Sequence, residues 1–231
     1  MITHFEVDGR RVAYRLRSGR GPTLVFLPGY GSDMEGNKAL ALDAFAERTG
    51  IALLRLDYSG TGSSEGEFRQ GTLARWLTEV LAAIDQQTEG PLILIGSSMG
   101  GWLALHAALQ RPDRVQALVG IAAAPDFTNW GFTAEQAAHL TDEGHLTRTF
   151  WESGQQALLL DGRIDATCPV RLVHGAEDRD VPLDVAFRTM RALRSADVQL
   201  NVIKGGGHRL SEPHEIDAIL RTVQALLEPA P

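Results

Sequence analysis

Hydrophobic residues recur along this chain in two alternating patterns. Short unbroken apolar runs, typical of strands buried on both faces of a parallel sheet, are followed by longer stretches with the 3.6-residue period of amphipathic helices. Apolar and polar side chains also alternate on either side of Asp8-Gly9, which predicts a β-hairpin over residues 5–14. The runs predict strands at 23–27, 51–57, 91–95, 115–122, 170–173 and 198–203, and the periodic stretches predict helices at 38–48, 73–84, 99–109 and 211–227.

This succession of strands and helices predicts an α/β protein. We expect a mostly parallel sheet of the eight-stranded type with helices on both faces, and ligand sites at the carboxyl ends of its strands. The alternation breaks once, between residues 126 and 167, where we expect a short, partly helical cap over that edge. Residues 1–231 are treated as a single domain, and residues 228–231 are expected to form a frayed tail.

Composition narrows the class of protein further. The 231 residues are 44% hydrophobic, which suffices for one core, and the net charge is -7. Basic residues are scattered singly, so we expect no nucleic-acid partner, because such binding requires clustered lysine and arginine. The single cysteine, Cys168, cannot form an intrachain disulfide. No signal peptide, mitochondrial targeting segment or membrane span is recognised, and a cytoplasmic location is therefore expected.

The strongest candidate for chemistry is the segment Gly96-Ser97-Ser98-Met99-Gly100. It lies between the apolar run 91–95 and a helical pattern, which is the context of a nucleophile elbow, a turn that exposes a reactive serine above a sheet. A side chain at Gly96 or Gly100 would collide with the neighbouring element. Ser98 is the predicted nucleophile, whereas Ser97 occupies the variable position. A strand-to-helix turn without chemistry is the competing interpretation.

A serine nucleophile needs a general base that is oriented by a carboxylate, and in this architecture the acid precedes the histidine. Asp178 follows the strand 170–173 and is the predicted acid. His208 lies on a glycine-rich loop after the last strand and is the predicted base. Glu177 and Asp180 are more typical of solvated turn residues. Asp126, just past the strand 115–122, is the alternative acid.

Two backbone N–H groups are predicted to form the oxyanion hole. The loop after the strand 23–27 supplies Tyr30 N–H, and the residue after the nucleophile supplies Met99 N–H. The glycine-rich loop 58–64 lacks the spacing of a phosphate-binding motif and is expected to be a rim of the site. Helix 211–227 is expected to take Ser211 as its N-cap.

The predicted cap contributes aromatic side chains that are candidates for an acyl pocket, namely Trp130, Phe132 and Trp151. The alternative is that they only pack the cap onto the body of the protein. The remaining histidines show no metal-ligand spacing, so neither a metal nor another cofactor is predicted.

Several segments together resemble the α/β-hydrolase superfamily, over essentially the whole chain. Within it, they are similar to the palmitoyl-protein thioesterase and acyl-glucuronide esterase branch of the abhydrolase-domain proteins. The resemblance implies a Ser98, Asp178 and His208 triad, and hydrolysis of esters or S-acyl thioesters. The segments that carry it are Gly29–Met34, Asp57–Gly60, Gly96–Trp102, Cys168–Gly175 and His208-Arg209.

These observations predict a serine hydrolase that works through an acyl-enzyme intermediate. The expected partner is a small-molecule ester or an acylated thiol, including an S-acylated protein, with no stable insertion into membranes. A carboxylesterase, lactonase or acyl-glucuronide esterase without a protein substrate is the alternative. A ligand-binding protein that retains the fold without turnover is a more remote one. The sequence predicts no particular oligomeric state.

Overall fold

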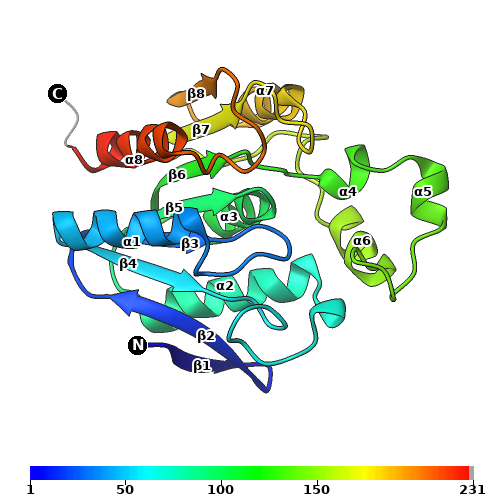
Figure 1. Cartoon of the computed structure of the whole chain (residues 1–231), viewed down its shortest axis with the longest axis horizontal. Coiled ribbons are helices and arrows are strands. Elements are labelled where there is room, and N and C mark those ends of the chain that lie inside the picture. The colour runs from blue at the N-terminus through cyan, green and yellow to red at the C-terminus, as the bar shows by residue number, and fades with distance from the viewer. Residues whose placement is uncertain (229–231) are drawn as a thin grey trace.

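The computed structural model describes residues 1–228, and residues 229–231 of the expected tail lie outside that range. Its centre is one eight-stranded sheet with the order β1-β2-β4-β3-β5-β6-β7-β8 (Figure 1). The strands are β1 (Thr3–Val7), β2 (Arg10–Arg17), β3 (Arg20–Leu27), β4 (Ile51–Leu56), β5 (Leu92–Ser97), β6 (Val115–Ile121), β7 (Val170–Gly175) and β8 (Val198–Ile203).

The helices connect these strands in the predicted alternation. They are α1 (Asn37–Thr49), α2 (Leu73–Gln87), α3 (Met99–Gln110), α4 (Phe127–Trp130), α5 (Ala134–Ala138), α6 (Arg148–Gln155), α7 (Leu183–Ala192) and α8 (Pro213–Leu227), with a 3₁₀ turn at Phe68–Gln70. Strands β3 to β8 are parallel, while β1 and β2 form the predicted hairpin and β2 pairs antiparallel to β4. The predicted α/β class and mostly parallel sheet are confirmed.

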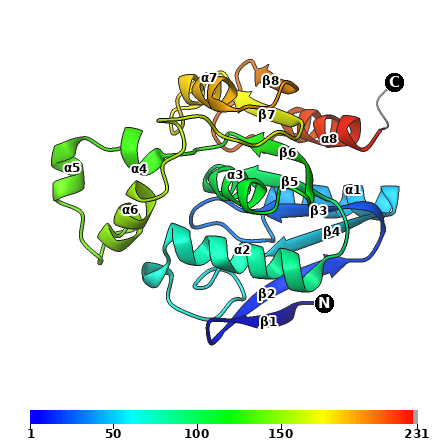
Figure 2. The ribbon, with the colours of Figure 1, turned by 180° about the vertical axis from the view of Figure 1, so that it is seen from behind.

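Successive residues of the central strands enter different hydrophobic cores. Leu24 and Phe26 of β3 pack with α1 and α8, whereas Val25 and Leu27 of the same strand pack with α2 and α3. Helices α1 and α8 accordingly cover one face of the sheet, and α2 and α3 cover the other (Figures 1 and 2). Burial on both faces explains why these strands appear in the sequence as continuous apolar runs.

Helices α4, α5 and α6 stand beyond the carboxyl ends of the strands, in the segment expected to form the cap (Figure 1). The carboxylate of Asp126, just before α4, accepts hydrogen bonds from the N–H groups of Leu159 and Leu160, after α6. It therefore connects the beginning of the cap to its later part. Trp102 Nε1 of α3 donates to the carbonyl of Ala157, and His106 contacts the same oxygen.

Within residues 1–228, no helix is both long and apolar enough to cross a bilayer.

The last helix begins later than predicted. Glu212, rather than Ser211, is its N-cap, and Pro213 occupies the first turn. Glu212 and Glu215 pair as a capping box, in which Glu215 Oε2 accepts a hydrogen bond of 2.8 Å from the N–H of Glu212. The Ser211 hydroxyl instead donates to the carbonyl of Arg209, so the predicted cap residue belongs to the preceding turn.

Candidate active site

Ser98 occupies a strained turn between β5 and α3. Its φ and ψ are 52° and -119°, a backbone conformation that residues with a side chain rarely adopt. Neighbouring glycines make the turn possible. A Cβ at Gly96 would lie 2.2 Å from the carbonyl oxygen of Gly100, and one at Gly100 would lie 2.0 Å from that of Leu27. The close approach of three backbone segments therefore explains the glycine spacing of the motif.

His208 and Asp178 complete a continuous line of hydrogen bonds from Ser98. The Oγ of Ser98 lies 3.1 Å from His208 Nε2, and His208 Nδ1 lies 2.9 Å from Asp178 Oδ2. A proton on Nδ1 directed at the carboxylate leaves Nε2 free to accept from the serine hydroxyl. Residues 98, 178 and 208 come from the ends of β5, β7 and β8, which the parallel sheet brings to one edge.

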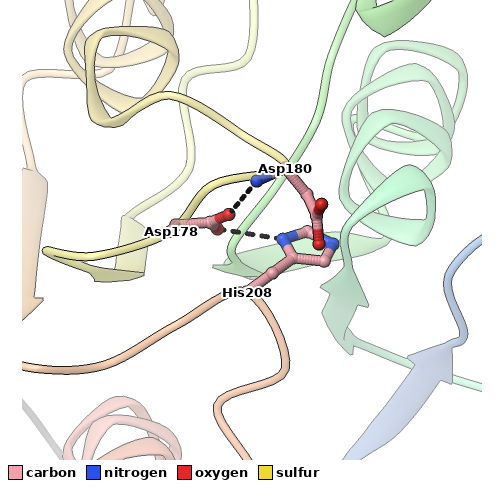
Figure 3. A group of neighbouring side chains, drawn as sticks. All are labelled: Asp178, Asp180 and His208. Carbon is pink, nitrogen blue, oxygen red and sulfur yellow. Dashed lines mark hydrogen bonds and ion pairs between the residues drawn. The ribbon is translucent and has the colours of Figure 1, made fainter.

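The carboxylate of Asp178 is fully buried and is held by several donors. Its Oδ1 accepts a hydrogen bond of 2.9 Å from the N–H of Asp180 (Figure 3) and another of 2.9 Å from the N–H of Val181. Burial opposes ionisation, but the hydrogen bonds from His208 and Val181 hold the pKa of Asp178 below its ordinary value. Asp178 is therefore ionised and oriented towards the imidazole.

The alternative acid, Asp126, has a different surrounding. Its carboxylate binds the backbone of the cap at Leu159 and Leu160, and burial raises its pKa. Glu177 is exposed, as expected for a turn residue. The geometry thus brings Asp178, and not Asp126, against His208.

Asp180 lies closer to the site than the sequence indicates. Ligand atoms of Asp178, Asp180 and His208 lie within 4.8 Å of one another, and the Asp180 side chain lies over the imidazole in Figure 3. Carboxylate and imidazole atoms at this spacing are of the types that bind cations. Two of its members, however, already share a hydrogen bond, and a metal at those atoms would have to replace it.

Sequence reasoning missed a second histidine beside Asp178. His174 is the fifth residue of β7 and is 1% exposed; its Nε2 lies 2.9 Å from the carbonyl of Val181 and 3.5 Å from Asp178 Oδ2. His174 thus contacts both ends of the turn from Asp178 to Val181, which holds the Asp178 carboxylate in place. Its place four residues before Asp178 is the only sequence signal, and a strand histidine of this kind has no distinctive motif.

The loop after β3 approaches Ser98 from the other side. A Cβ at Gly29 would lie 3.3 Å from that of Ser98, so the backbone before Tyr30 passes close to the serine. No hydrogen bond from Tyr30 N–H occurs among the described residues outside regular elements. Met99 begins α3, and the first N–H groups of a helix lack intrahelical acceptors. Both groups are available as oxyanion donors.

A cleft of about 560 Å³ opens beside Ser98 and His208. Its walls are the loop after β3, the start of α1 and the histidine loop, and polar side chains and glycines predominate. Lys38 of α1 donates a hydrogen bond to the carbonyl of Arg209, and burial lowers its pKa. This contact links α1 to the loop of the candidate base, and the sequence analysis did not anticipate it.

The three cap aromatics of the predicted acyl pocket are not among the residues that line this cleft. Trp130 Nε1 donates to the carbonyl of Pro125, and Trp151 Nε1 donates to that of Thr128, so both indoles hold cap backbone. Phe132 is half-buried. An acyl pocket at these residues stays a prediction.

Tyr30 is the aromatic residue that connects the cleft to the cap. Its hydroxyl donates to the carbonyl of His145, and its ring packs edge-on against Phe150. Burial raises the pKa of this hydroxyl to about 12, which keeps it protonated as a donor. The cap therefore contacts the loop that carries one candidate oxyanion donor.

The sheet order and the strand-to-helix turn at Ser98 are those of an α/β-hydrolase fold, and similarity to known proteins agrees with this. The chain belongs to the α/β-hydrolase family, because the family model described as alpha/beta hydrolase fold matches residues 22–144. It is similar to the human protein named palmitoyl-protein thioesterase ABHD10, mitochondrial, with 36% identity over 96% of this chain and 78% of the relative. The mouse relative of the same name is 37% identical over 94% and 79%.

Solved structures agree with this assignment. The alpha/beta hydrolase domain-containing protein 10 from mouse superimposes with a TM-score of 0.92, 35% identity and coverage of 98% of both chains. A putative hydrolase from Agrobacterium vitis S4 has a TM-score of 0.89 and 35% identity over 99% of this chain and 100% of its own. The protein is thus a hydrolase, as the sequence analysis expected.

The expected cytoplasmic location is wrong in the light of these relatives. Five vertebrate thioesterases that match most of the chain are named mitochondrial. The expectation rested on residues near Met1 and on the single cysteine, and neither feature distinguishes the cytoplasm from another reducing compartment.

Proposed function

We propose that this protein is a serine hydrolase that cleaves S-acyl thioesters and carboxylic esters through an acyl-enzyme formed on Ser98. The observation that carries the proposal is the hydrogen-bonded line Ser98–His208–Asp178, with distances of 3.1 and 2.9 Å. A carboxylate, an imidazole and a hydroxyl in this order can draw a proton from serine towards histidine.

In the acylation step, Ser98 Oγ attacks the carbonyl carbon while His208 Nε2 takes its proton. The carbonyl oxygen becomes an oxyanion, which the N–H groups of Tyr30 and Met99 stabilise. The tetrahedral intermediate collapses when the bond to sulfur or to the ester oxygen breaks, and the imidazolium returns its proton to that leaving group. Asp178 keeps the proton on Nδ1 and stabilises the imidazolium that forms.

In the deacylation step, a water molecule takes the place of the departed thiol or alcohol. His208 removes its proton, the hydroxide attacks the acyl carbon, and the same two N–H groups hold the second oxyanion. The carboxylic acid leaves as the proton returns to Ser98 Oγ. The cycle thus consumes one water and needs no cofactor.

The relatives support thioesters as substrates, since those that match most of the chain are named palmitoyl-protein thioesterases. A hydrolase of small polar esters, such as acyl-glucuronides, is the second candidate. It is favoured by the cleft beside Ser98, which is lined mainly by glycines and polar side chains, Lys38 and Arg209 among them. The chain length of the acyl group separates the two.

The proposal is tested with the purified protein and its Ser98→Ala variant. A fluorophosphonate probe should label only the wild type, and the variant should lose about 10⁴-fold or more in kcat on p-nitrophenyl butyrate, because the acyl-enzyme cannot form. Ser97→Ala is the matched control and should be labelled. Rates on butanoyl and palmitoyl thioesters of N-acetylcysteamine then choose between the two candidates. Full activity of Ser98→Ala would contradict the proposal.

A further inference from the structure

The end of β4 and the two residues after it contact both ends of the loop that carries Tyr30. Met34 closes that loop, and its N–H donates to Asp57 Oδ1 over 2.7 Å. The Met34 carbonyl accepts a hydrogen bond of 2.7 Å from Arg55 Nη1. Met34, Arg55 and Asp57 are each no more than 4% exposed, so water does not compete for these contacts.

The other end of the same loop is held by the next residue along the chain. The hydroxyl of Tyr58, which is fully buried, donates to the carbonyl of Pro28 over 3.0 Å. Pro28 and Met34 therefore bracket the segment that holds Gly29, which passes close to Ser98, and Tyr30. Arg55, Asp57 and Tyr58, called the β4 clamp below, hold the two ends of the segment that contains Tyr30.

We propose that Asp57 is the central positioning residue of the candidate oxyanion hole, acting through Met34 on the backbone of Tyr30. The inference rests on the proposed function, because it requires that Tyr30 N–H stabilises an oxyanion. Asp57 does not touch the substrate. It sets the placement of a group that does.

A carboxylate is required at this position because it accepts on both sides. Asp57 Oδ2 accepts from the N–H of Ser63 over 2.8 Å, while Oδ1 accepts from Met34. Gly62 leaves no room for a shift, since a Cβ there would lie 2.1 Å from Asp57 Oδ2. An asparagine would direct its NH₂ group at one of the two N–H donors and would lose that contact. Displacement of an oxyanion donor by about 1 Å can reduce catalysis by about 10²-fold.

The test compares Asp57→Asn with wild type in two measurements. One is the rate of hydrolysis of p-nitrophenyl butyrate, and the other is inhibition by octylthio-trifluoroacetone, which forms a tetrahedral oxyanion adduct with an active-site serine. We expect kcat/KM to fall about 10- to 100-fold and the inhibition constant to rise by the same factor, with KM within about twofold. A residue that only supports the fold would lower the melting temperature without this matched change.

Glu79→Gln is the matched control. Glu79 is also a buried carboxylate that accepts a backbone N–H, that of Ser59, but it has one such bond and makes none to residues 28–34. Glutamine can keep that bond, so its kcat/KM and inhibition constant should stay within about threefold of wild type. An equal loss in both variants would overturn the assignment.

Tyr58→Phe keeps the proposal testable if Asp57→Asn does not fold. It removes only the hydroxyl that holds Pro28 and should give a smaller matched change, about 3- to 10-fold in kcat/KM and in the inhibition constant. Unchanged inhibition in folded Asp57→Asn or Tyr58→Phe overturns the inference. Failure of the proposed function has a different signature, namely full activity of Ser98→Ala.

Discussion

At the scale of single residues, the site depends on a few side chains whose surroundings are unusual. Ser98 sits at φ 52°, and a residue held in such a region costs about 1 to 3 kcal/mol, which the packing around Gly96 and Gly100 must offset. Asp178 is buried yet ionised because donors surround its carboxylate. In both cases an unfavourable local free energy, from backbone strain at Ser98 and from burial of charge at Asp178, occurs where the proposed reaction needs an atom in a fixed position.

The lowered pKa of Asp178 predicts a pH dependence of stability. A carboxyl whose folded pKa lies below its unfolded value of 3.8 adds stability above that pH, and this contribution is lost as the pH falls through the folded pKa. The free energy of unfolding of the wild type, measured in urea, should therefore fall more between about pH 5 and about pH 2.5 than that of Asp178→Asn. These two pH values lie on either side of the reference pKa. Parallel curves for the two proteins would contradict the assigned shift.

At neutral pH, the same Asp178→Asn variant should lose about 10⁴-fold in kcat, since its amide favours the wrong imidazole tautomer.

At the scale of elements, the cap is attached to the body mainly through aromatic packing beneath α6. Phe150 of α6 is fully buried and stacks on Phe127 of α4, with ring centroids 5.7 Å apart, and it also contacts Tyr30 and Trp76. Trp102 of α3 adds a hydrogen bond to the cap backbone. The short cap helices have little stability of their own, so tertiary contacts of this kind must hold them.

Phe150→Ala should lower the free energy of unfolding by about 3 to 5 kcal/mol in urea titration, because the variant loses buried area and leaves a cavity. Hydrogen exchange should speed up in α4 and α6 before it does in α3, since the cap loses its principal anchor. Phe187→Ala on α7 is the control. That ring is 39% exposed, and its removal should change stability by about 0.5 kcal/mol or less. Equal losses in the two variants would argue against the assigned role of Phe150.

At the scale of the whole molecule, the parallel sheet brings together segments that are far apart in the chain. The candidate nucleophile and base are separated by 110 positions, and Lys38 contacts the carbonyl of Arg209 across 171. Three glycines precede His208, so the histidine loop has little stiffness of its own. Contacts from other elements, with α1 prominent among them, must limit its motion.

Replacement of Lys38 by methionine keeps the apolar stem and removes the donor to Arg209. We expect kcat on p-nitrophenyl butyrate and the rate of fluorophosphonate labelling to fall together, by about 3- to 10-fold, as His208 spends less time in line with Ser98. Lys204, the other lysine of the chain, is exposed, and Lys204→Met should leave both rates within about twofold. Unchanged labelling of Lys38→Met would show that the contact does not position the base.

Local order along the chain was enough to predict the strands, most helices and the elbow at Ser98. Apolar periodicity and glycine spacing report burial and close backbone approach within a few residues, and the structure has the α/β sheet that they predict. The N-cap of α8 was misjudged by one position, because a proline and a capping box outweighed the preference of Ser211.

Contacts between distant segments were decided only by the tertiary structure. The pattern alone left Asp126 and Asp178 as competing acids, and the fold separates them by placing one in the cap junction and the other against His208. Loop 58–64, expected only to be a rim of the site, contributes Tyr58 to the β4 clamp and contacts Asp57 through the N–H of Ser63. Such roles depend on which strand ends meet at one edge of the sheet, and residue spacing within one segment carries no information about that.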